Sequence, residues 1–217
     1  MRNSSQFVPT IVIAAFLAAA LGAACFFLAR RSFSWHSGDH HGNMRDWKPI
    51  SGKWGEHAGI ISNRNYGRGD MLIAQRSKGG DYRISADVRF DLLLPETEYG
   101  DAGLVIRTTD PEQGVDSYQG YYAGIRPNQQ TIVLGRASYD WHQLSTATLA
   151  TPITIGNWYH LVLAVKGCKL TVIATPQDDR SSTRIEYTDD HCLTEGVAGL
   201  RSFYTQASWR NVQIGHN

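Results

Sequence analysis

Short runs of alternating apolar and polar residues recur along most of this chain. The segment 82–90 alternates strictly, with apolar residues at its even positions and polar or charged residues at its odd positions. The segment 159–165 repeats the pattern, with an apolar residue at every odd position. A period of two predicts β-strands with one face in a core. Lys166-Gly167 then predicts a tight hairpin turn into a strand that begins near Lys169, since glycine accepts positive φ.

Turn residues separate these runs from one another, and no long amphipathic helix is apparent after Arg45. Many short strands in one domain of ordinary size are typical of a β-sandwich or jelly roll. We therefore predict an all-β domain over residues 45–217. The predicted strands are 59–62, 71–75, 82–93, 102–107, 118–125, 131–137, 158–165, 169–174, 184–187, 199–204 and 208–214.

The N-terminal part has a different character. Residues 8–29 carry no charge and are rich in Ala, Leu, Ile, Val and Phe. This length suits one transmembrane helix, and a cleavable signal peptide has a shorter apolar region. We predict a short segment 1–7, a membrane anchor 8–29 and a polar tether 30–44, with a cleaved signal and lipidation at Cys25 as alternatives. Arg30 and Arg31 after the span favour a cytoplasmic domain by the positive-inside rule.

Charge excludes one class of partner. The whole chain has a net charge of +1, and its first 31 residues hold three Arg and no acid, which leaves +1 − 3 = −2 for the rest. A nearly neutral domain has no electrostatic footprint for nucleic acid.

The stretch 101–125 carries the strongest candidate binding residues. Two strands joined by a polar turn bring Arg107 toward Tyr121 and Tyr122, with Asp101 at the start of the first strand. A guanidinium fork and a tyrosine ring suit a polar ring such as a sugar. In a regular strand one of the two tyrosines points into the core, and we expect Tyr122 to be the exposed one. The alternative is that Arg107 packs its stem on a tyrosine and binds nothing.

Trp141 offers a second candidate, since Asp140 and His142 flank it as in sugar-stacking subsites. The alternative is a hairpin tip with its Trp folded back on the domain. Candidate catalytic acids are Glu98, Asp101 and Asp140. No strand carries several acids on one face, so the carboxylate pair that glycosidases need is not evident.

Several short motifs occur in an order that resembles concanavalin A-like jelly-roll domains. Within that group the chain is similar to family 66 carbohydrate-binding modules and to the 3-keto-disaccharide hydrolase domain. The resemblance covers about residues 47–214. The motifs are Gly52-Lys-Trp54, Asp81-Tyr-Arg-Ile-Ser-Ala-Asp-Val88, Asp101-Ala-Gly-Leu-Val-Ile-Arg107, Gly120-Tyr-Tyr-Ala-Gly-Ile125, Ile132-Val-Leu-Gly-Arg136, Gly156-Asn-Trp-Tyr-His-Leu161, Gly196-Val-Ala-Gly-Leu-Arg201 and Ala207-Ser-Trp-Arg-Asn-Val212.

The resemblance implies a two-sheet concanavalin A-like jelly-roll sandwich, with ligand at the concave sheet or a rim, outside the cytoplasm. Cys168 and Cys192 could pair in an oxidising compartment, and the resemblance strengthens this over two free thiols. Such domains often hold a structural calcium ion, although no linear calcium-loop motif identifies its ligands. We expect a single-pass membrane protein whose extracytoplasmic domain binds a glycan without catalysis. The alternative is a hydrolase of glycosidic bonds in 3-keto-disaccharides or related oligosaccharides.

Overall fold

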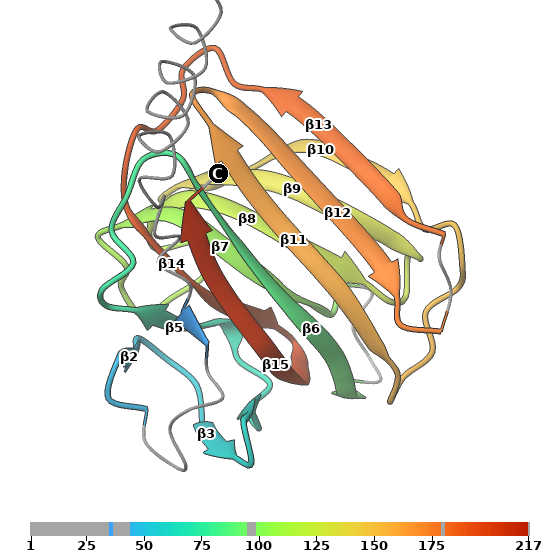
Figure 1. Ribbon diagram of the computed structural model, residues 1–217. Coiled ribbons are helices and arrows are strands. Elements are labelled where there is room, and N and C mark those ends of the chain that lie inside the picture. The colour runs from blue at the N-terminus through green and yellow to red at the C-terminus, as the bar shows by residue number, and fades with distance from the viewer. Residues whose placement is uncertain (1–34, 37–43, 95–98, 179–180, 217) are drawn as a thin grey trace, which may run out of the picture. The chain divides into compact units, whose positions relative to one another are not determined.

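The alternating segments of the sequence form the long strands of a two-layered sandwich. The computed structural model describes residues 35–36, 44–94, 99–178 and 181–216, all within one unit, Phe33–Asn217. Every strand pairing within it is antiparallel (Figure 1). The all-β, two-sheet sandwich prediction is confirmed.

The first layer, which we name sheet A, has eight strands. Its spatial order is β13 (Thr183–Thr188), β12 (Lys169–Pro176), β11 (Trp158–Lys166), β6 (Tyr82–Leu93), β15 (Thr205–His216), β4 (Ile60–Asn63) and β3 (Trp54–His57), with β1 (Trp35–His36) also paired to β15. The predicted hairpin after Lys166 is present, since Lys166 pairs with Lys169 and Gly167 has φ 55°.

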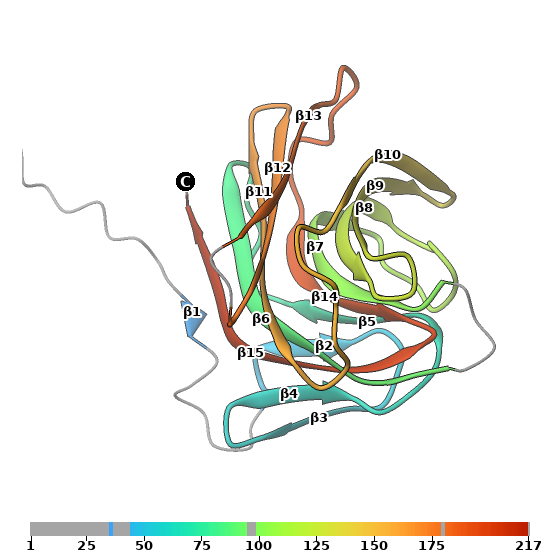
Figure 2. The same cartoon turned by 90° about the vertical axis from the view of Figure 1, so that its right-hand side faces the viewer.

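The second layer, sheet B, has seven strands. Its order is β10 (Trp141–Thr148), β9 (Thr131–Ser138), β8 (Gln119–Arg126), β7 (Asp101–Thr109), β14 (Val197–Phe203), β5 (Arg68–Ala74) and β2 (Trp47–Pro49). Figure 2 shows the two layers, with β6, β11, β12 and β15 in one and β7, β8, β9 and β10 in the other.

The main core lies between the two sheets. Every second residue of the central strands points into it, so that Ile84 and Leu161 of sheet A meet Leu104 and Tyr121 of sheet B in one buried cluster. Trp209 on β15 is fully buried there, with its ring centroid 5.2 Å from that of Trp54. Fully burying one large apolar side chain contributes roughly 1.5–3 kcal/mol to stability, so the core between the sheets holds the sandwich together.

A smaller apolar cluster covers part of the opposite, outer face of sheet B. Its buried members are Met71, Ile73, Val105, Tyr118, Tyr122, Val133 and Ala137. An outer sheet face normally meets water, so a buried cluster there needs a cover. Residues 110–118 supply part of it: Tyr118 belongs to the cluster, and a Cβ on Gly69 of β5 would lie 3.1 Å from the carbonyl oxygen of Gly114.

The predicted anchor 8–29 and most of the predicted tether 30–44 lie outside the described residues. Within the part of the chain that the structure describes, no helix is long and apolar enough to cross a bilayer.

Candidate functional site: a cleft on the outer face of sheet B

A cleft of about 310 Å³ opens on the outer face of sheet B. Its lining residues are aromatic or charged. They come from β5, β7, β8, β10 and β14, from the loops before and after β7, and from the junction between β14 and β15. They are Arg68, Tyr99, Asp101, Asp116, Tyr122, Arg126, Trp141, Arg201, Phe203 and Tyr204.

Glycines make room for the rings of this cleft. A Cβ on Gly124 would lie 2.2 Å from the hydroxyl oxygen of Tyr122, so the Tyr122 side chain lies directly over that glycine. A Cβ on Gly135 would lie 2.2 Å from the ring of Trp141 in the same way. The Tyr122 and Trp141 rings meet edge to face, with centroids 6.0 Å apart. Replacement of either glycine would therefore force a ring out of place.

Arg201 is the centre of the charged part of the cleft. Its guanidinium carbon lies 4.7 Å from the ring centroid of Tyr122 and 5.7 Å from that of Phe203. Its Nη2 donates a 2.8 Å hydrogen bond to Asp116, and its Nη1 lies 3.7 Å from Asp101. Because Arg201 is 3% exposed, these partners replace the water that the cation loses on burial.

Asp101 is shared by several cleft residues. It accepts a 2.6 Å hydrogen bond from the Tyr122 hydroxyl, and Arg126 Nε lies 3.6 Å from its other oxygen. Burial raises the pKa of Asp101 above its usual range, and the charge of Arg201 and the Tyr122 hydrogen bond offset only part of that rise. Burial also raises the pKa of Tyr122, and the neighbouring Asp101 charge adds to the effect. Tyr122 is therefore a neutral donor at physiological pH.

The two cleft carboxylates bind one guanidinium, so Asp101 and Asp116 lie within about 10 Å of each other, in the range of glycosidase acid pairs. Both are nonetheless engaged, since Asp116 is ion-paired and Asp101 receives Tyr122 and faces two arginines. The arrangement offers aromatic faces, hydrogen-bond donors and acceptors to a polar ring, and it offers no free carboxylate.

The structure brings three of the predicted binding residues together. Asp101, Tyr122 and Trp141 all line the cleft. Tyr121 points to the other side of the sheet, where its hydroxyl donates to Asp189 at 2.7 Å and accepts from the backbone nitrogen of Leu193 at 3.0 Å. The expectation that Tyr122 is exposed is wrong, because Arg201 and Trp141 cover its ring and leave it fully buried.

Arg107 lies away from the cleft. The pairing of β7 with β8 shifts register just after Ile106, and Arg107 itself has φ 50°. Its side chain is buried and donates to the carbonyl oxygens of Gly80 and Leu193 and to the carboxylate of Asp81. Arg107 thus ties two loops to the end of β7, and it is not a lining residue.

Two of the three predicted catalytic acids, Asp101 and Asp140, are described, and they do not both line the cleft. Asp140 lies in the turn before β10, where it is exposed and accepts a 2.8 Å hydrogen bond from the backbone nitrogen of Trp141. Glu98 lies outside the described residues. Of the two candidates that the structure describes, Asp101 lines the cleft and Asp140 does not.

Sequence reasoning missed most of the charged and aromatic wall, namely Arg68, Tyr99, Asp116, Arg126, Arg201, Phe203 and Tyr204. Arg201 and Phe203 lie on a predicted strand, where they alternate with buried Leu200 and Ser202. This alternation indicates that Arg201 and Phe203 share one face of the strand. What the pattern could not reveal is that β14 pairs with β7, which brings this face beside Asp101.

Cys168 and Cys192 form a disulfide in the structure. It joins the β11–β12 turn to the loop before β14, which also receives Arg107 and Tyr121. For metals, the described residues contain no group of three or more His, Cys, Asp or Glu side chains that could hold an ion.

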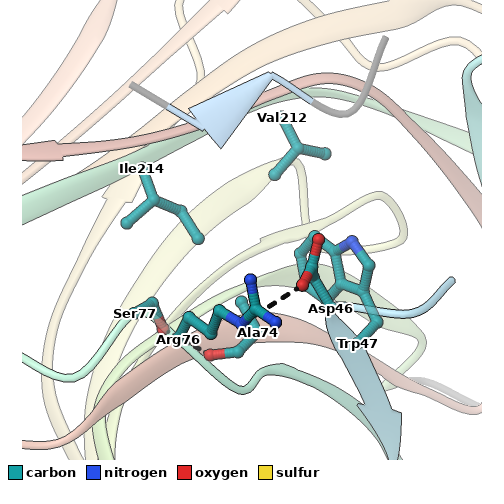
Figure 3. Close-up of a pocket in the computed structure, with 7 residues that line it drawn as sticks. All are labelled: Asp46, Trp47, Ala74, Arg76, Ser77, Val212 and Ile214. Atoms are coloured by element: carbon teal, nitrogen blue, oxygen red, sulfur yellow. Dashed lines mark hydrogen bonds and ion pairs between the residues drawn. The ribbon is translucent and has the colours of Figure 1, made fainter. Parts of the chain in front are cut away.

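A second hollow, of about 20 Å³, opens between the sheets near β2 (Figure 3). Val212 and Ile214 of β15 face Ala74 and Trp47 across it, and Asp46 pairs with Arg76 at 3.5 Å on its wall. A space of this size holds about one water molecule. It is a packing gap, and the cleft on sheet B is the candidate ligand site.

Comparison with known protein families identifies the family of this chain. The family model described as the 3-keto-alpha-glucoside-1,2-lyase-like domain matches residues 38–215. The chain belongs to this family. No curated protein matches it.

Solved structures share the fold of this 3-keto-alpha-glucoside-1,2-lyase-like domain. The carbohydrate-binding module CBM66 from Bacillus subtilis is 21% identical with a TM-score of 0.64, over 80% of this chain and 97% of that one. Lectin II from Ulex europaeus is 11% identical with a TM-score of 0.63, over 86% and 98%. The exoplasmic/lumenal domain of VIP36, in a form bound to Ca²⁺ and Man3GlcNAc, is 14% identical with a TM-score of 0.58, over 81% and 85%. The chain thus has the lectin-like jelly-roll fold.

Proposed function

We propose that this chain binds carbohydrate, without catalysis, in the cleft on the outer face of sheet B. The observation that carries the proposal is that aromatic rings and a buried guanidinium–carboxylate network line the same cleft. A sugar ring presents an apolar C–H face and a rim of hydroxyl groups. Aromatic rings match the first, while arginine and carboxylate groups match the second as donors and acceptors.

The size of the cleft fits a small part of a glycan. Ligand pockets span roughly 300–1,000 Å³, and about 310 Å³ is at the lower end of that range. Tyr99 at the border is 54% exposed, so a longer chain has an aromatic surface to follow beyond the cleft. One or two sugar units within the cleft are the ligand that we expect.

The engaged state of the acids supports binding over hydrolysis. A glycosidase needs one carboxyl group to donate a proton and a second to attack or to activate water. Asp116 is held by Arg201 at 2.8 Å, and Asp101 accepts the Tyr122 hydroxyl at 2.6 Å. Neither carboxylate is free for the second role.

Glycan-array screening of the full-length chain, followed by calorimetry on the best ligand, tests this proposal. Trp141→Ala removes one wall and is expected to weaken binding about tenfold, which corresponds to roughly 1.4 kcal/mol. The matched control is Trp158→Ala, because Trp158 packs against Arg210 and Arg89 at guanidinium–centroid distances of 4.2 and 4.6 Å in sheet A. Equal losses in the two variants, or no binding to any glycan, would refute the proposed site.

A second candidate function is cleavage of a 3-keto-disaccharide or a related oligosaccharide, by hydrolysis or by elimination. The family description favours it, and so does the raised pKa of Asp101, because a carboxyl group that keeps its proton can donate it to a leaving sugar. Incubation of the chain with 3-keto-disaccharides, with and without divalent metal ions, distinguishes the two functions. Sugar release that Asp101→Asn abolishes and Asp140→Asn retains would make this function the better one.

We further propose that residues 8–29 anchor the chain in a membrane with the domain outside the cytoplasm. The Cys168–Cys192 disulfide supports this location, because disulfides persist in oxidising compartments. Protease added to intact cells should remove the domain. Protection of the domain until the cells are lysed would contradict the proposed orientation.

A further inference from the structure

Building on the proposed function, we propose that the ligand of the cleft is an acidic sugar, whose carboxylate binds beside Arg126 and Arg68. The distribution of fixed charges in the cleft supports this proposal. Its described lining residues include three arginines and two aspartates, whereas residues 32–217 as a whole have a net charge of −2. The excess of positive charge is therefore a local feature of the cleft.

The charged residues form a row across four neighbouring strands. Asp101 of β7 pairs with Phe203 of β14, and Phe203 pairs with Arg68 of β5. On the other side of β7, Arg126 of β8 lies 3.6 Å from Asp101. The row thus reads Arg126, Asp101, Phe203, Arg68 along one edge of the cleft. It holds an arginine at each end and one carboxylate, with an aromatic ring between that carboxylate and Arg68.

That single carboxylate already serves other groups. Its Oδ1 accepts the hydroxyl of Tyr122 at 2.6 Å and lies 3.7 Å from Arg201. Its 3.6 Å approach to Arg126 is longer than a hydrogen bond. Arg126 has a 14% exposed side chain, and the one hydrogen bond that it donates within the described part of the chain goes to Gln143 at 2.9 Å. Its guanidinium is mostly buried, and its one acidic neighbour among the described residues is Asp101, which Tyr122 and Arg201 also contact, so the charge of Arg126 is only partly compensated.

Arg68 is exposed and has no acidic partner among the described residues. Its guanidinium carbon lies 5.9 Å from the ring centroid of Tyr204, which also lines the cleft. The charges of Arg201 and Asp116, which pair at 2.8 Å, neutralise each other. The unbalanced charge therefore belongs to Arg126 and Arg68, and burial further raises the pKa of Asp101, which favours its uncharged form.

A sugar carboxylate supplies what these groups lack. Arginine forms paired hydrogen bonds with a planar carboxylate, and such charge-assisted bonds are stronger than bonds to neutral hydroxyls. Phe203 and Trp141 are half-buried lining residues, and they would contribute aromatic surface to the sugar ring itself. The inferred ligand class is thus a hexuronic acid unit within an oligosaccharide.

Calorimetry on the full-length chain tests this inference with oligomers of galacturonate, glucuronate and mannuronate, each as the free acid and as its methyl ester, and with neutral oligosaccharides. We expect at least one free acid to bind about tenfold more tightly than its ester, with an affinity that falls as salt screens the charges. Arg68→Gln should weaken the acid about fivefold and change the ester less than twofold. The matched control Arg83→Gln, at an exposed position of sheet A, should change neither.

Two results would overturn the inference, and they are distinguishable. If neutral sugars or esters bind as tightly as the acids and Arg68→Gln behaves like Arg83→Gln, the acidic ligand is wrong while carbohydrate binding stands. If no sugar of either class binds, the proposed function fails together with this inference.

Discussion

Gly124→Ala should damage both the fold and the cleft, because Tyr122 occupies the space of the missing side chain. The new methyl group would lie 2.2 Å from the Tyr122 hydroxyl oxygen and 2.5 Å from Cζ, so the ring must move. Overpacking of this kind costs roughly 1–3 kcal/mol. Displacing the ring also breaks the 2.6 Å bond to Asp101, and an unsatisfied buried acceptor costs roughly 1–3 kcal/mol. The expected loss in the free energy of unfolding is about 2–6 kcal/mol.

Urea unfolding of the variant measures this loss, and Gly55→Ala is its matched control. Gly55 also lies in a strand, but nothing lies within 4 Å of its added Cβ, so that variant should be neutral or slightly stabilised. The cause can be isolated with Tyr122→Ala, since Gly124→Ala should cost little once the ring is gone, so the coupling energy should nearly equal the loss itself, about 2–6 kcal/mol. Equal stabilities of Gly124→Ala and Gly55→Ala would refute the reasoning.

Three further changes test other parts of the account. Arg107→Leu removes the hydrogen bonds to the loops at Gly80 and Leu193, so the free energy of unfolding in urea should fall by about 2–4 kcal/mol. Glycan affinity should stay within twofold. A large loss of affinity would show that Arg107 belongs to the binding site. Reduction of the disulfide, which closes a loop of 24 residues, should lower the free energy of unfolding by about 3 kcal/mol, and an unchanged urea midpoint under reductant would contradict this. Burial raises the pKa of Asp189. Hydrogen bonds from Tyr121, the His191 backbone and Arg136 lower this pKa by more than burial raises it, so the pKa lies below its usual range. A carboxylate whose pKa is lower in the folded state stabilises the fold fully at pH values above its unfolded-state pKa. It loses this contribution as the pH falls through its folded-state pKa. Asp189→Asn should therefore flatten the decline in stability below about pH 4.

The long strands were predictable because their period of two coincides with one buried face. The strands β6 and β11 show this alternation in both sequence and burial. The strand β10 was missed for the opposite reason. It is an edge strand in which most positions are exposed or half-buried, so Trp141–Thr148 has no apolar stripe to mark it.

The sequence located the site in the right stretch but could not determine its geometry. Regular alternation assigns Tyr122 and Gly124 correctly to one face of β8, and the structure places both at the cleft. The same rule failed for Arg107, because the register shift after Ile106 breaks the alternation locally. The exposure predicted for Tyr122 failed because its cover comes from distant strands, in particular Arg201 on β14.

Non-local pairing explains why the charged wall was invisible in the sequence. Asp101 and Arg201 are far apart along the chain and adjacent in space, since β7 and β14 pair in sheet B. No local pattern encodes which strands become neighbours, and a one-residue slip would exchange the faces. The composition of the cleft therefore required the structure.

A crystal structure of the chain with its best oligosaccharide bound tests carbohydrate binding in the cleft most directly. We predict a sugar ring on the outer face of sheet B, between Trp141 and Phe203, with hydrogen bonds to Arg126 and to the carboxylate of Asp101. A sugar bound instead on sheet A beside Trp158, or only at loops remote from Arg201, would contradict it.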